Sequence, residues 1–259
     1  MKKSLKIATA FVLTVSCAIG AAACNLFNGK TKSNLTKEGW EEIVEYAENL
    51  KAYRVICTTE KQGEDLISET FEADLERAEP RFTYNKLGNA AGTIADEYIM
   101  MDDEEDTFLY SWEYNGEAEM WRTVKRNVTP SEGGKDAPFN DFKRKYDLRA
   151  DMLGITYYPS GVAVGVDLKG MYGYLTYSQG KWIGDMAFNL SDALYTGSVS
   201  VENIADNIES FRKNKNGLLF RLTLTASAEG TSFKWTYDIQ GHTSGFVTNP
   251  PTNAEFVTD

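Results

Sequence analysis

The chain has 259 residues, of which 27 are basic and 38 acidic, for a net charge of −11 at neutral pH. An acidic field of this size repels nucleic-acid phosphates and anionic membrane surfaces, so we expect neither as an electrostatic partner. The chain has one histidine, His242. This count argues against a zinc site built from several histidines and against a histidine-dependent catalytic triad.

The first 23 residues carry the pattern of a targeting segment. Lys2, Lys3 and Lys6 form a short positive region, and residues 7–23 contain no charged side chain. This apolar run is slightly shorter than the about 20 residues of a membrane-spanning helix, and it ends in small side chains. We therefore interpret residues 1–23 as a signal peptide and exclude them from the fold.

Two cysteines stand at the end of the apolar run. Bacterial lipoprotein signals place small or aliphatic residues before a cysteine that is acylated and becomes the first residue of the mature chain. Cys24 follows residues 21–23, all alanine, whereas a cut before Cys17 would leave six apolar residues on the mature chain. We expect lipid on Cys24, with Cys17 as the alternative and an unlipidated secreted form as a third.

The mature chain would keep 24 basic and 38 acidic side chains, a net charge of −14. Its attachment to the membrane must then come from the acyl chains and not from charge. We expect an extracytoplasmic protein that is anchored to the cell membrane by lipid on Cys24. Residues 24–35 are interpreted as a flexible tether, and residues 36–259 as one domain.

The domain is expected to begin with an amphipathic helix over residues 36–51. Thr36 is placed to cap its free amides, and Trp40, Ile43 and Ala47 fall on one face. A long run of strand signals follows, with apolar and polar side chains in alternation. We predict strands at 53–57, 66–71, 82–84, 97–101, 106–114 and 120–124, with a type I′ turn at Asn115-Gly116 before the last one.

The second half of the domain is expected to add two helices and further strands. Phe139, Phe142 and Tyr146 predict a helix that runs to about residue 153. Residues 200–216 predict another, with Ser200 as its cap and a buried face of Val201, Ile204, Ile208 and Phe211. The predicted strands lie at 161–168, 172–177, 182–190, 220–225 and 233–239, and the last two form a hairpin.

These elements indicate an α+β fold with about ten antiparallel strands and about three helices. A sheet this wide tends to curl, and its concave side must be filled by helices, side chains or a ligand. We therefore expect a single strongly curved sheet, a half-barrel, wrapped over the helices.

The sequence offers little chemistry for catalysis. Ser210 and Lys213 match the Ser-x-x-Lys motif of penicillin-binding enzymes, but Phe211 between them belongs to a buried stripe and no Lys-Thr-Gly element follows. The acidic run at 102–106 lacks the alternating spacing of a calcium loop and is interpreted as a solvated hairpin end. Cys57 is expected to be a small buried hydrophobe. We predict no enzyme, no metal site and no cofactor.

Aromatic side chains are frequent in the predicted strands. We expect most of them in the core, although some could line a pocket, and the sequence does not separate the two roles. These residues are Tyr110, Trp112, Trp121, Tyr172, Tyr174, Trp182, Phe233 and Trp235.

Three features occur together: the cysteine signal at Cys24, a Trp40-containing helix before a long meander with Trp121 near a strand start, and a closing hairpin followed by 249–251. Together they resemble the bacterial lipoproteins of the LolA/LolB/LppX-like superfamily. The resemblance spans about residues 36–257 and implies a half-barrel that carries lipids or lipoproteins between sheet and helices. It transfers no binding residue, because no motif matches position by position.

We therefore expect a non-enzymatic lipoprotein that binds or carries a lipid or other apolar ligand in the concave cavity. The alternative is a surface interaction or sensor module with a solid core, which binds another envelope protein or a cell-wall component. An exposed aromatic patch on the outer face of the sheet would favour this alternative.

The choice between the two cysteines is testable by metabolic labelling with a fatty acid. Cys24→Ala is expected to abolish lipid labelling and to release the protein from the membrane fraction, because the acyl chains are its anchor. Cys17→Ala is expected to change neither. Loss of labelling in Cys17→Ala alone would show that the acylated residue is Cys17.

Overall fold

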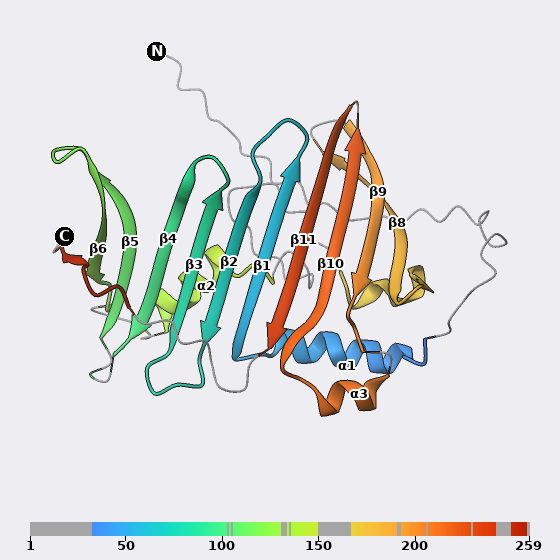
Figure 1. Cartoon of the computed structure of the whole chain (residues 1–259). Helices are drawn as coiled ribbons and strands as arrows, with labels where there is room; N and C mark the ends of the chain where they lie inside the picture. Colours follow the sequence, from blue (N-terminus) through green and yellow to red (C-terminus); the bar gives the residue numbers. More distant parts are fainter. Residues whose placement is uncertain are drawn as a thin grey trace, which may run out of the picture.

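The fold is taken from a computed structural model of the chain (Figure 1). The structure describes residues 33–102, 104, 106–130, 134, 136–149, 167–190, 193–205, 207–228, 230–241 and 250–257. The predicted signal peptide, Cys17, Cys24 and His242 lie outside these residues. Among the described residues, no helix is long and apolar enough to cross a membrane.

The domain is built on one sheet of twelve strands, as Figure 1 shows. The first half of the chain forms a meander of six strands: β1 (Ala52–Lys61), β2 (Ile67–Asp74), β3 (Arg81–Gly88), β4 (Gly92–Met101), β5 (Thr107–Asn115) and β6 (Met120–Asn127). The second half forms a meander of five: β7 (Thr176–Ser178), β8 (Lys181–Leu190), β9 (Ala193–Glu202), β10 (Gly217–Ala228) and β11 (Thr231–Gly241). The short β12 (Glu255–Phe256) follows.

The two meanders join in the middle of the sheet. β1 pairs with β11 in antiparallel register, from Tyr53 opposite Gly241 to Lys61 opposite Phe233. One edge of the sheet is β7, and the other is β12, which pairs with β6 in parallel. The fold is therefore α+β with a single, mostly antiparallel sheet, as the sequence predicts, and the sheet is open.

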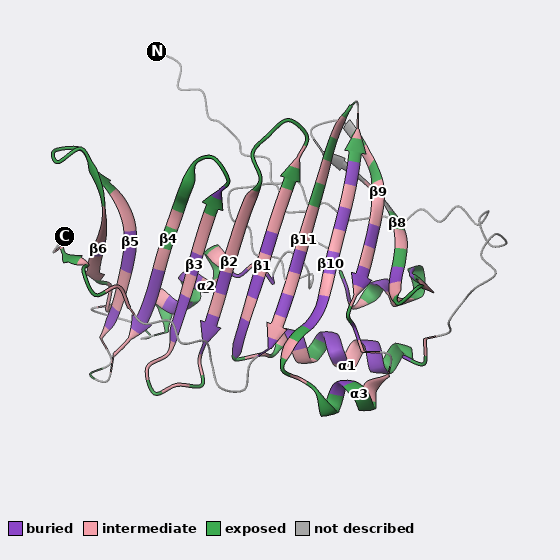
Figure 2. Cartoon of the chain, viewed as in Figure 1, coloured by how far each residue is buried: buried purple, intermediate pink, exposed green. Residues whose placement is uncertain are grey.

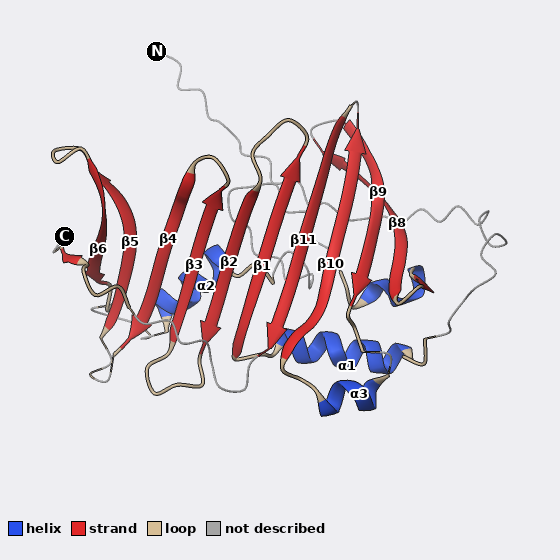
Figure 3. Ribbon diagram, viewed as in Figure 1, coloured by secondary structure: helices blue, strands red, loops and turns tan. Residues whose placement is uncertain are grey.

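The helices lie on one side of this sheet (Figure 3). They are α1 (Lys37–Glu48), α2 (Ala137–Tyr146), the 3-10 helix η1 (Gly170–Tyr174) and α3 (Ile208–Lys213). α1 confirms the first predicted helix: the Thr36 hydroxyl accepts a hydrogen bond from the Gly39 amide, and Trp40, Ile43 and Ala47 are fully buried. Leu35, at the end of the predicted tether, is buried as well.

The side chains of each strand alternate between two faces. The helix-side face carries Tyr53, Val55 and Cys57 on β1, all at most 3% exposed, which confirms the prediction for Cys57. The core continues on the neighbouring strands and reaches the helices at Trp40, whose indole nitrogen donates to the Leu168 carbonyl oxygen at 2.9 Å. We call the other face, with Arg54 on β1, the open face, because no described helix covers it (Figure 3).

The helix predicted at 200–216 is wrong in its first half. Residues 193–202 are strand β9, the left-handed backbone of Asn203 (φ 61°) follows its end, and α3 begins only after Asn207, whose side chain accepts from the Ser210 amide. Val199 and Val201 alternate with serines, so they fit the helix-side face of a strand. Strand pairing with β10 therefore outweighs the helical spacing of the apolar residues.

Three further predictions need correction. Residues 170–174 form η1 in place of the strand predicted from residue 172, and only 176–178 are extended. α2 ends at Tyr146, earlier than predicted, and most of the strand predicted at 161–168 lies outside the described residues. The β5–β6 connection is a four-residue loop at 116–119, in which the Asn115 side chain accepts two backbone hydrogen bonds, and not a two-residue type I′ turn.

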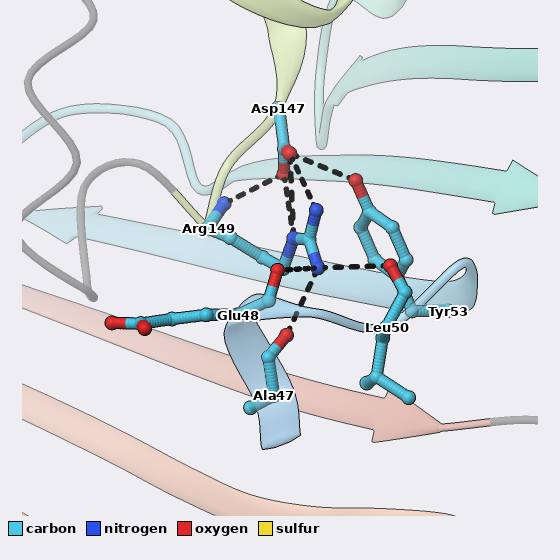
Figure 4. Close-up of polar contacts among 6 residues, drawn as sticks. All are labelled: Ala47, Glu48, Leu50, Tyr53, Asp147 and Arg149. Atoms are coloured by element: carbon cyan, nitrogen blue, oxygen red, sulfur yellow. Dashed lines mark hydrogen bonds and ion pairs between the residues drawn. The ribbon is translucent and has the colours of Figure 1, made fainter. Parts of the chain in front are cut away.

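A buried polar cluster follows α2 and ties it to the rest of the core (Figure 4). The Arg149 side chain is 2% exposed and forms an ion pair with Asp147, with 3.0 Å between Nη2 and Oδ2. Its Nη1 donates to the carbonyl oxygens of Ala47, Glu48 and Leu50 at 2.9 to 3.3 Å. Ala47 and Glu48 are the last two residues of α1, whose carbonyls have no helical partners, so Arg149 caps that helix and also binds the chain just after it.

Tyr53 completes the cluster from strand β1. Its hydroxyl donates to the Asp147 carboxylate at 2.8 Å, and its ring lies under the guanidinium of Arg149 at 3.4 Å from the ring centroid. Burial, with a further contribution from Asp147, raises the pKa of Tyr53 well above its usual range. Burial lowers the pKa of Arg149, but Tyr53 and Asp147 outweigh this effect, so Arg149 stays charged.

Removing the buried arginine is expected to destabilise the fold strongly. Arg149→Ala leaves the Asp147 charge without its buried partner, which costs about 3–5 kcal/mol of unfolding free energy. Arg212→Ala is the matched control, because its ion pair with Glu42 lies at the surface, and we expect it to change stability little. Urea denaturation followed by circular dichroism measures both. Equal midpoints for the two variants would contradict the assigned role of Arg149.

Candidate functional site

Most of the open face is an ordinary solvated sheet surface. Thr58, Thr236, Thr223 and Ser200 follow one another across β1, β11, β10 and β9 in a single row. Ion pairs lie beside them, such as Arg221 Nε to Asp238 Oδ1 at 2.6 Å. Hydroxyl groups and paired charges keep this part of the face compatible with water.

The open face carries aromatic side chains at the β5–β6 end of the sheet, while the helix-side face there combines polar side chains with Leu109 and the buried Val124. Register places Glu97 beside Ser111, and Tyr98 beside Tyr110. The helix-side face of β5 therefore carries Ser111 and Glu113, while aromatic side chains point to the open face. At this end the sheet presents its aromatic surface away from the helices.

We name the exposed part of these side chains the aromatic patch. It consists of Trp112 and Tyr114 on β5, Trp121 on β6 and Phe256 on β12, which register and strand alternation place on the open face. Tyr114 and Phe256 are 54% exposed and Trp121 is 49% exposed. Figure 2 shows the exposed β5–β6 hairpin.

The rings of the patch are held against one another. Trp112 and Trp121 stack with 5.9 Å between ring centroids and 8° between planes, and Tyr114 meets Trp121 at 5.7 Å and 60°. Each such ring pair adds about 0.5–1.5 kcal/mol of stability beyond the contribution of the apolar area that it buries. Trp112, Tyr114 and Trp121 are thus an ordered group of rings and not isolated side chains.

The C-terminal segment covers the row of aromatics next to the patch. Ala254 packs against the cluster of Tyr98 and Tyr110, which are only 4% and 6% exposed and meet edge to face at 5.5 Å. Lys125 extends over the Phe108 ring at 3.9 Å. These aromatics have a structural role on the open face, whereas the patch beyond them stays half-exposed.

Ion pairs on the opposite face hold the hairpin that carries the patch. Arg126 Nη2 donates to Glu113 Oε2 at 2.9 Å, and this hydrogen bonding lowers the pKa of Glu113. Arg122 pairs with Glu255 and so fixes β12 beside β6. Glu113 of β5 and the two arginines of β6 are therefore paired on the face opposite the patch, whereas Lys125 lies on the open face.

A shallow depression lies next to the patch on the same face. Its volume is about 590 Å³, and its lining includes Arg54, Glu72, Thr70, Asn85, Asp96 and Tyr98, with Pro251 of the C-terminal segment. Arg54 and Glu72 form an ion pair within it. Tyr98 connects the depression to the aromatic row through its contact with Tyr110.

A second polar group, on the helix-side face, joins α2 to the sheet. Tyr84 and Tyr146 stack at 4.3 Å between centroids, and their hydroxyls donate to Glu69 and Glu97. Burial, followed by the hydrogen bonds to these carboxylates, raises the pKa of both tyrosines. Both therefore stay protonated donors, so the group is suited to packing and not to proton transfer near neutral pH.

The aromatic residues singled out in the sequence divide into several environments. Tyr110 and Trp182 are buried, as expected for core residues, whereas Tyr174 is 53% exposed on η1. Phe233 and Trp235 stack on the helix-side face and are half-buried, and Tyr172 packs against Trp40. Only Trp112 and Trp121 come together in the patch.

The other candidate residues do not assemble into a site. Ser210 is exposed at the start of the six-residue α3, next to the buried Phe211, so the Ser-x-x-Lys spacing has no pocket around it. Asp102 accepts the Glu104 and Asp106 amides and so closes the β4–β5 turn. Within the described part of the chain, no group of three or more His, Cys, Asp or Glu is arranged to hold a metal ion.

Comparison with known proteins adds no family to these observations. No model of a protein family matches the chain, and no curated protein sequence matches it either.

The aromatic patch is expected to be dispensable for folding. Trp121→Ala removes a half-exposed ring together with its contacts to Trp112 and Tyr114, and should cost about 1–2 kcal/mol of unfolding free energy. Trp182→Ala, by contrast, empties a core position and should cost about 3–5 kcal/mol. Denaturant titration distinguishes them, and equal losses of stability would mean that the patch belongs to the core.

Proposed function

We propose that the protein is a membrane-anchored, extracytoplasmic binding module that contacts its partner through the aromatic patch. The anchor in this proposal is lipid on Cys24, and the module carries out no chemistry of its own. The observation that carries the proposal is the half-exposure of Tyr114, Trp121 and Phe256 on a face that no described helix covers (Figure 3).

Exposing large rings in water is unfavourable, by about 25 cal/mol for each Å² of apolar surface. Contiguous exposed apolar surface on a folded domain marks interaction sites for this reason. Aromatic residues are also the residue types that contribute most to binding energy at interfaces. Here three of the four rings lie on the β5–β6 hairpin, whose arginines are paired on the other face, so the patch is available to a partner.

The packing of the helix-side face also favours a module of this kind. Helix α1 fills the space below the sheet with Trp40, Ile43 and Val44, none of which is exposed. α2 does the same beside β3, where Phe142 stacks on Phe82 at 6.2 Å. At these positions side chains fill the space between sheet and helices that a carried ligand would occupy.

A lipid carrier with a half-barrel sheet is the second candidate function. It is favoured by one observation, the half-buried stacked pair Phe233 and Trp235 on the helix-side face, with Tyr195 5.8 Å from Phe233. Solvent extraction of the purified protein followed by mass spectrometry tests this candidate. Recovery of a stoichiometric lipid besides the one attached to cysteine would favour the carrier over the binding module.

Site-specific photo-crosslinking in intact cells tests the binding module. With benzoylphenylalanine in place of Tyr114, we expect a defined covalent adduct, because the residue lies in the patch. The control places it at Tyr174, which is equally exposed, at 53% against 54%, but lies on η1. Adducts from the Tyr174 position alone, or from neither position, would contradict the proposal.

A further inference from the structure

We infer that the partner of the aromatic patch is a neutral glycan, which stacks on Trp112 and Trp121 and extends into the adjacent depression on the open face. This inference rests on the proposed function and names the chemical class of the ligand. It combines three observations: the parallel rings, the polar lining of the depression, and the balance of charge around both.

The rings of Trp112 and Trp121 offer a surface that suits the apolar face of a sugar ring. Their planes lie within 8° of each other, and Trp121 is about half exposed. Aromatic faces carry partial negative charge, so they attract the weakly positive C–H groups that a pyranose ring presents on one side. An aliphatic lipid chain carries C–H groups on all sides, so the rings would not hold it in one orientation.

The depression next to the patch supplies hydrogen bonds of the kind that sugar hydroxyls need. Asn85 on β3 stands directly opposite Asp96 on β4, and Thr70 on β2 stands beside Asn85. The amide of Asn85 and the hydroxyl of Thr70 can both donate and accept hydrogen bonds, and the carboxylate of Asp96 accepts them. All three side chains line the depression and are half-buried or exposed, so an incoming ligand can reach them.

The patch and the depression form one continuous surface. Asp96 lines the depression and is exposed, and register places it beside Trp112 on the open face, because the next residue, Glu97, pairs with Ser111. From β2 to β6 the sheet advances four strands, roughly 19 Å at the usual strand spacing. A chain of several sugar units can therefore contact the rings and the polar groups at once.

The charges favour a neutral ligand. The net charge of −11 repels anionic polymers. Within the depression Arg54 is paired with Glu72, Arg122 is paired with Glu255 on the opposite face, and Lys125 extends over the Phe108 ring, so these cations do not form a positive cluster for phosphate or carboxylate groups. Sugar hydroxyls carry no charge and meet no such repulsion.

The test measures retention of the detergent-solubilised full chain on insoluble neutral glycans. The probes are cellulose, chitin and peptidoglycan sacculi stripped of anionic polymers. We expect retention on at least one of them, about fivefold weaker in Trp121→Ala because of the lost stacking and in Asn85→Ala because of the lost hydrogen bond. Tyr174→Ala, outside the surface, should bind like the unaltered protein.

Four outcomes would overturn the inference. The first is no retention on any probe, and the second is equal retention of Trp121→Ala and the unaltered protein. The third is a concentration-dependent self-association, seen by light scattering, that Trp121→Ala abolishes, because the occupant would then be a second copy. A patch-specific crosslink from position 114 to a protein would likewise refute a glycan partner while leaving the binding module intact.

Discussion

The pairing of β1 with β11 is the constraint on which the rest of the structure depends. These strands lie about 180 positions apart in the chain, yet they pair continuously from Tyr53 opposite Gly241 to Lys61 opposite Phe233. Each meander alone is built from neighbouring strands, and only this central pair makes them one sheet. Because such distant pairing requires the closure of a long loop, it must be supported by packing on both strands. That packing comes from Val55, Ile239 and the helices that cover them.

The Arg149 cluster fixes the helices to this central pair. Its guanidinium caps α1, its partner Asp147 follows α2, and Tyr53 belongs to β1. One buried ion pair thus connects three elements at the place where the two halves of the sheet meet. With the helix-side face held in this way, the open face is left for contact with a partner, and its β5–β6 end is where the aromatic surface lies.

The sequence predicts this architecture well wherever the signal is local. Thr36 caps a helix whose apolar positions recur at helical spacing, and the last hairpin alternates strictly, so both are confirmed. The helix predicted at 200–216 fails because Val201, Ile204, Ile208 and Phe211 satisfy a helical spacing by coincidence. Val201 is buried on strand β9, whereas Phe211 lies on α3 and packs edge-on against Tyr46 of α1.

The aromatic patch could not be predicted, for a physical reason. Tyr110, Trp112 and Tyr114 alternate with Leu109, Ser111 and Glu113 just as core residues alternate in the other strands. The face that meets the helices is decided by the register passed from β1 through four strand pairs, and not by β5 itself. The sequence contains one signal of this arrangement. Glu113 and Arg126 carry opposite charges, and on the helix-side face they pair with each other.

The central claim is that the helix-side face maintains the fold while the β5–β6 end of the open face binds the partner. Hydroxyl-radical footprinting of the protein in native cell envelopes and after purification tests it most directly, because it reports the exposure of each aromatic ring. The account predicts that Trp112, Tyr114 and Trp121 are protected in envelopes and become reactive after purification, while Tyr174 reacts equally in both. Unchanged reactivity of the patch, with protection confined to the helix-side pair Phe233 and Trp235, would contradict it.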